Sequence, residues 1–189
     1  MPEELKIHER PPIGEPYVPP AKVQKVEKPA YTLNVNKALD KEFETRSFKE
    51  ICELPPSCLQ GIAAASDEKF GHLKIRTIRD LGEWKYYKLA KAIQALAETE
   101  EEGKRNSEGN SNINAGLIKE YETKSFKEIL QAPPSALSGL SAEWVDEELQ
   151  KNIRPHVTTI EELANWKYCR WAEAFITLAE YENADHTSR

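Results

Sequence analysis

The sequence predicts an all-α protein: two tandem copies of a small helical module behind an extended, proline-rich tail. Three observations lead to this expectation. Residues 34–62 recur closely as residues 112–140, helix-start signals stand at matching places in both copies, and the alternating β-branched runs of strands are nearly absent. A chain of 189 residues is long enough for two such modules.

The repeat sets the limits of the two copies. Residues 77–100 match residues 159–182 as well, and the second copy carries four additional residues before this stretch. The first copy is therefore expected at 34–99 and the second at 112–183.

The remaining segments have different compositions. Residues 1–33 hold seven of the twelve prolines, which prevents helix formation and favours an extended tail. Residues 100–111 are charged, contain Gly and Ser and lack large apolar side chains, so they are interpreted as a flexible linker. Residues 184–189 are interpreted as a short C-terminal tail.

Each copy should begin with a short capped helix. Ser47 and Ser125 both start an S-x-x-E capping box, in which the hydroxyl and the carboxylate each satisfy a backbone N–H of the first turn. A Pro-Pro pair follows in both copies and should end the helix.

A tight turn is expected next. After the prolines, a short helix leads to Gly61 in the first copy and to Gly139 in the second, where glycine can adopt the left-handed conformation. A second helix should follow, at about 66–73 and 142–152.

The last part of each copy should contain two more helices. Thr77 and Thr159 each precede an acidic residue by three positions, which predicts a capped short helix. The final helix is the longest and should close the module with an apolar face made of Trp84, Leu89, Ile93 and Leu96, and of Trp166, Trp171, Phe175 and Leu178. The expected core positions are Phe48, Ile51, Leu59, Ile78, Leu81, Phe126, Ile129, Leu137, Ile160 and Leu163.

The turn and its flanking helices, at residues 54–84 and 132–166, resemble a helix-hairpin-helix repeat. The resemblance implies a comparison with DNA-binding members of that family. Their hairpin resembles G-[IV]-G, and its backbone N–H groups approach a phosphate. Both copies depart from the motif, because Ala63 and Ser141 replace the second glycine and acidic residues follow. A structural hairpin is therefore favoured over a phosphate site.

Two aromatic motifs recur, Trp84-Lys85-Tyr86 and Trp166-Lys167-Tyr168. Packing in the core is the favoured interpretation, with a protein interface as the main alternative and stacking on nucleic-acid bases as the third. In the tail, prolines surround three apolar residues that could anchor an extended strap, although a spacer without contacts is equally consistent with the sequence. The candidate partner-binding residues are Ile13, Tyr17, Val18, Trp84, Tyr86, Trp166 and Tyr168.

The three cysteines, Cys52, Cys58 and Cys169, form no C-x-x-C pair and stand where the other copy has Leu, Ala and Tyr. Buried, reduced thiols in a reducing compartment are expected. No motif predicts a catalytic residue, a metal site or a cofactor.

Charge and hydropathy bound the function. A net charge of -6 opposes binding to nucleic acid, and no apolar run is long enough to cross a bilayer. The chain is therefore interpreted as a non-enzymatic adaptor, scaffold or structural subunit that binds protein partners in the cytoplasm or, after processing, in an organellar stroma. A nucleic-acid-binding protein that uses its hairpins is the alternative.

Overall fold

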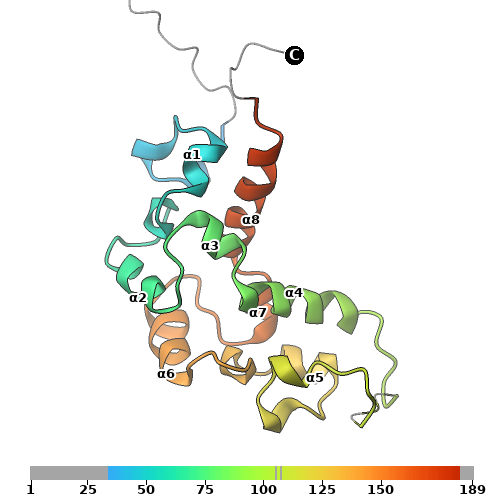
Figure 1. Cartoon of the computed structure of the whole chain (residues 1–189). Helices are drawn as coiled ribbons and strands as arrows, with labels where there is room; N and C mark the ends of the chain where they lie inside the picture. The colour runs from blue at the N-terminus through green and yellow to red at the C-terminus, as the bar shows by residue number, and fades with distance from the viewer. Residues whose placement is uncertain (1–33, 105, 107, 184–189) are drawn as a thin grey trace, which may run out of the picture.

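The computed structural model describes residues 34–104, 106 and 108–183, and these residues form helices joined by short turns, with no strand among them (Figure 1). The all-α prediction is confirmed. The segments 1–33 and 184–189, which hold the predicted tails, lie outside the described residues.

The elements occur in the same order in both copies. The first copy contains η1 (Asn36–Ala38), η2 (Lys41–Phe43), α1 (Phe48–Cys52), η3 (Pro56–Cys58), α2 (Ser66–His72), α3 (Ile78–Gly82) and α4 (Lys85–Ala97). The second contains η4 (Asn114–Gly116), η5 (Lys119–Tyr121), α5 (Phe126–Leu130), η6 (Pro134–Ala136), α6 (Ala142–Trp144), the π-helix η7 (Val145–Asn152), α7 (Ile160–Ala164) and α8 (Lys167–Glu180).

The predicted helix starts are confirmed. Ser47, Ser125, Thr77 and Thr159 each cap a helix, and in all four the acidic residue three positions later accepts from the N-cap backbone N–H. These reciprocal bonds explain how helices of only five residues begin at fixed positions.

The turns after the Pro-Pro pairs are 3-10 helices, shorter than the α-helices that precede them. In each turn a proline occupies the first position, and the following leucine is extended. Leu59 forms an antiparallel bridge with Leu39, and Leu137 forms the same bridge with Leu117. Gly61 and Gly139 follow with φ of 101° and 88°, which confirms that both turns need a residue that tolerates positive φ.

The four additional residues of the second copy lie in its second helical segment. Whereas α2 is a regular helix of seven residues, the equivalent segment joins α6 to the π-helix η7. A wider helical turn accommodates an insertion without moving the flanking contacts. Val145, at the start of η7, and Val157, in the chain after η7, are fully buried.

The last helix of each copy packs against the other copy. In Figure 1, α4 lies beside α5 and α7, and α8 lies beside α1 and α3; these are the main contacts of both helices. The expectation that each helix closes its own copy therefore requires a correction. Because both copies present similar apolar faces, the helical pattern predicted a closing helix but could not indicate which face it covers.

This packing of α4 and α8 against the other copy, here called the exchange, produces two blocks that are formed from different parts of the chain. One block is continuous in sequence and runs from α4 to α7, about residues 84–165. The other combines residues 34–83 with residues 166–183, so the two ends of the described chain meet in one core (Figure 1).

Nine of the ten predicted core residues are buried, and the tenth, Phe126, is partly buried. The apolar face of the last helix is less complete than predicted. Leu96 and Leu178 are 54% and 46% exposed, although they occupy helical spacing with buried residues. They lie at equivalent positions near the ends of α4 and α8.

Candidate interaction surfaces

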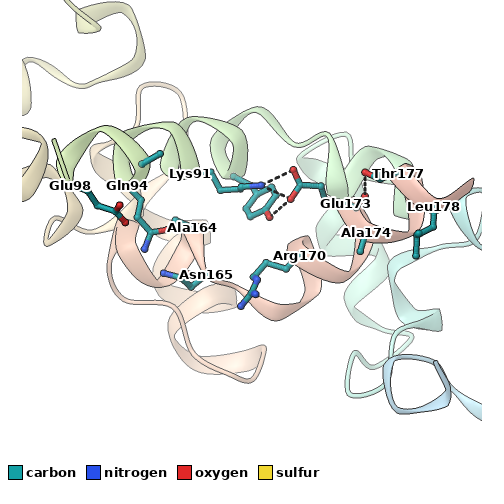
Figure 2. Close-up of a pocket in the computed structure, with 12 residues that line it drawn as sticks. Lys91, Gln94, Glu98, Ala164, Asn165, Arg170, Glu173, Ala174, Thr177 and Leu178 are labelled. Carbon is teal, nitrogen blue, oxygen red and sulfur yellow. Dashed lines mark hydrogen bonds and ion pairs between the residues drawn. The ribbon is translucent and has the colours of Figure 1, made fainter. Parts of the chain in front are cut away.

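A polar network joins the two exchanged helices. Tyr87 of α4 donates its hydroxyl hydrogen to Oε2 of Glu173 on α8 over 2.7 Å (Figure 2). Lys91 Nζ also donates to both carboxylate oxygens of Glu173, over 2.7 and 2.6 Å. The contact therefore links one copy to the other through a charge-assisted cluster.

The ionisation of this cluster follows from its surroundings. Burial alone would raise the pKa of Glu173, but the hydrogen bonds from Lys91 and Tyr87 outweigh burial and lower the pKa below its usual value. Burial and the adjacent carboxylate raise the pKa of Tyr87. Near neutral pH the cluster thus holds an ionised Glu173 and a neutral Tyr87.

A groove of about 730 Å³ runs beside this network, between α4 and α8 (Figure 2). Gln94, Asn165 and Arg170 line it together with the charged pair. These side chains both donate and accept hydrogen bonds, so the groove offers a mixed polar surface along the contact between the copies.

A carboxylate after each exchanged helix caps the first helix of the other copy. Glu182 accepts from the backbone N–H groups of Phe48 and Lys49 at 2.8 and 3.0 Å. Glu100 accepts equivalently from the backbone N–H groups of residues 126–127, at 2.9 and 3.2 Å. The sequence carries the signal for this contact, a Glu at matching places beyond both last helices, but its partner lies too far along the chain to be inferred from it.

The aromatic motifs lie in the core. Trp84 stacks edge to face with Tyr86, and Trp166 with Tyr168, with ring centroids 5.5 and 5.3 Å apart. All four are buried, so core packing, the favoured interpretation, is confirmed. Binding of a separate protein by these four side chains remains a prediction that would require the two copies to part.

Each tyrosine of these motifs contacts the hairpin of the opposite copy. A Cβ atom on Gly61 would stand 2.8 Å from the hydroxyl of Tyr168, and one on Gly139 would stand 2.9 Å from the hydroxyl of Tyr86. Glycine is required at both turns for its backbone conformation, and the lack of a Cβ leaves room for the tyrosine hydroxyls. The hairpins serve as contacts between the copies.

Two lysines lie beside the hairpins. Lys85 and Lys167 each place Nζ 4.6 Å from the centre of the neighbouring tyrosine ring, at cation-π distance. The other candidate residues, Ile13, Tyr17 and Val18, lie outside the described residues.

The cysteines are fully buried, as predicted. Burial, with Asp67 and Asp40 nearby, raises the pKa of Cys58 to about 12. Burial also raises the pKa of Cys52 and Cys169. At neutral pH all three therefore stay in the thiol form, which is a poor nucleophile and a poor metal ligand.

An apolar groove of about 390 Å³ lies where the described chain begins. One side is the entry to η1, with Val35 and Ala38, and the other is the outer face of α8, with Trp171, Phe175 and Leu178. Phe175 forms the floor, since it is buried against Phe48 with ring centroids 5.8 Å apart.

Comparisons with protein-family models, curated proteins and solved structures gave no match. No helix in the described part of the chain has both the length and the apolar character that a bilayer crossing requires. Within residues 34–104, 106 and 108–183, no group of three or more His, Cys, Asp or Glu side chains is placed to hold a metal ion.

Proposed function

We propose that the chain is a non-enzymatic adaptor or structural subunit of a larger assembly, in which two tandem helix-hairpin-helix-like modules and the N-terminal tail bind protein partners. The observation that supports this proposal is the reciprocal exchange of α4 and α8. Because the buried residues of both copies form one hydrophobic core, the copies cannot change their spacing without exposing it, so the exchanged pair holds two related surfaces at a fixed distance. Linking two binding surfaces in this way raises the effective concentration of the second binding event.

An exposed strip on α4 is the best candidate for one such surface. Ala92, Ala95 and Leu96 are exposed and share one face of the helix at i, i+3 and i+4 spacing. Leu96 supplies the large side chain that anchors helix-in-groove contacts.

The experiment is a pull-down from the source cell with three baits: the full chain, the chain without residues 1–33, and Leu96→Ser. Glu180→Ser, an exposed position at the end of α8 and outside this strip, is the control. A specific protein that the full chain and the control capture, and that either altered bait loses, supports the proposal. A full chain that retains no protein specifically contradicts it.

One observation favours nucleic-acid binding as a second candidate. Lys167 Nζ lies 3.8 Å from the position of a Cβ on Gly61, and Lys85 Nζ lies 4.0 Å from that on Gly139, so a cation stands beside each hairpin. The net charge of -6 and the tyrosine hydroxyls against both glycines oppose this function.

A mobility-shift titration separates the two candidates. Sub-micromolar binding to duplex DNA at about 150 mM salt, weakened steeply by added salt and abolished in the double variant Lys85→Ala, Lys167→Ala, would favour the second candidate. An apolar protein interface would persist over the same range of salt.

A further inference from the structure

The apolar groove beside the chain start has an unusual composition for an exposed surface. Trp171 and Leu178 are both partly open to solvent across a floor of buried Phe175, and Val35 and Ala38 face them. An exposed apolar groove on a folded chain commonly marks a contact site. Since the described chain begins at Asn34, which also lines the groove, 33 further residues continue from its edge.

The second copy provides an internal comparison for the groove itself. Leu89 stands there in the position of Trp171, and Gly116 in the position of Ala38. A Cβ on Gly116 would lie only 2.8 Å from Leu89 Cδ2, so the leucine packs directly onto that turn. The first copy instead has a methyl group and a large indole at these positions, and both line the groove.

The residues that precede the two copies also differ in their apolar character. Tyr31-Thr32-Leu33 precede the open groove, whereas the matching residues before the second copy are Gly109-Asn110-Ser111. The copy with the indole-lined groove therefore follows a tyrosine and a leucine, and the copy with the filled turn follows side chains that need no apolar contact.

The spacing of the upstream residues fits the groove. Tyr31, Leu33 and Val35 alternate with polar residues, so an extended backbone would present all three on one side. Four residues of extended chain span at most about 13 to 14 Å. The wall of α8 from Trp171 to Leu178 is about 10 Å long, so the segment is long enough to follow it.

We infer that the groove formed by Val35, Ala38, Trp171, Phe175 and Leu178 binds the chain's own segment immediately upstream, with Tyr31 and Leu33 as its anchors. This contact fixes the base of the N-terminal tail on α8. The inference does not depend on the proposed function, because both sides of the contact belong to one chain.

The test uses the full chain with p-benzoylphenylalanine in place of Tyr31, irradiated at low concentration and mapped by mass spectrometry. We expect cross-links within the same chain to residues 171–178. Isotope-labelled chains mixed with unlabelled chains distinguish these from cross-links between chains. Cross-links between chains, or to other parts of the same chain, overturn the inference.

Two substitutions separate binding from mere proximity. Leu33→Ser and Leu178→Ser should each reduce the cross-link yield about tenfold, as expected when one buried leucine contact is lost. Leu96→Ser, at the equivalent position on α4, should leave the yield unchanged, and circular dichroism checks that each variant is folded. A yield that Leu33→Ser does not change shows proximity alone and overturns the inference.

Discussion

The two blocks of the molecule contain similar elements but are closed by different lengths of chain. The block from α4 to α7 is formed by neighbours in sequence, whereas the block of α1 and α3 is completed only when α8 arrives from the far end of the chain. Closing a longer loop costs more conformational entropy, and contacts between distant residues form more slowly. The comparison teaches that similar sequence copies need not be equal folding units.

The largest effects should come from the buried side chains of the exchanged helices. Phe175→Ala on α8 should lower the free energy of unfolding by about 3 to 5 kcal/mol, and Ile93→Ala, its equivalent on α4, by about 2 to 5 kcal/mol. Each substitution should loosen helices of the opposite copy. Native-state hydrogen exchange should show faster exchange in α1 and α3 for Phe175→Ala, and in α5 and α7 for Ile93→Ala.

The opposite distribution has a clear meaning. If Phe175→Ala loosened α5 and α7 while Ile93→Ala loosened α1 and α3, α4 and α8 would each pack against their own copy. The packing of each last helix against the other copy would then be wrong.

A glycine marks the next difference between the blocks. Gly82 ends α3, and a Cβ there would stand 2.7 Å from the backbone N of Glu173 and 2.8 Å from the backbone C of Ala172. The second copy has Ala164 at this position. Gly82→Ala should therefore destabilise the protein by about 1 to 3 kcal/mol through overpacking, although alanine is tolerated in the other copy.

Gly71→Ala is the control for this substitution. Gly71 lies inside α2, and a Cβ there would meet no atom within 4 Å. This change should leave the free energy of unfolding unchanged or raise it by about 0.5 to 1 kcal/mol. If Gly82→Ala destabilised the protein no more than Gly71→Ala does, the close approach of α3 and α8 would be contradicted.

The reciprocal carboxylate caps should have a smaller effect. Glu182→Ala removes the acceptor for two backbone N–H groups of α1, and Glu100→Ala removes the equivalent acceptor of α5. Each substitution should lower stability in urea by about 0.5 to 2 kcal/mol, as for other helix caps. Glu180→Ala, an exposed residue at the end of α8, should cost less than either, and an equal cost would contradict the capping role.

The sequence predicted the features of the fold that are encoded locally. Capping boxes, the glycine turns and most core positions depend on residues a few positions apart, so they could be inferred. The exchange and the caps by Glu100 and Glu182 depend on which of two similar surfaces a helix meets, and no local pattern carries that information. The apolar groove was missed for the same reason, because Val35 and Trp171 belong to distant segments.

The smallest expected effect tests the polar contact between the exchanged helices. Hydrogen bonds from Lys91 and Tyr87 lower the pKa of Glu173 against the opposing effect of burial. A carboxylate with a lowered pKa in the folded state stabilises that state above its unfolded pKa of about 4.3, and the contribution is lost as the pH falls through the folded pKa. The stability difference between the wild type and Glu173→Gln should therefore be constant near neutral pH and shrink in acid. It should not exceed about 1 kcal/mol, because the pair is partly exposed to solvent.

Urea unfolding of the wild type and of Glu173→Gln from pH 7 to about pH 3 measures this difference. The capping carboxylates are present in both proteins, so their contributions cancel from it. A difference that grows on acidification would show that Glu173 is not held ionised across the contact.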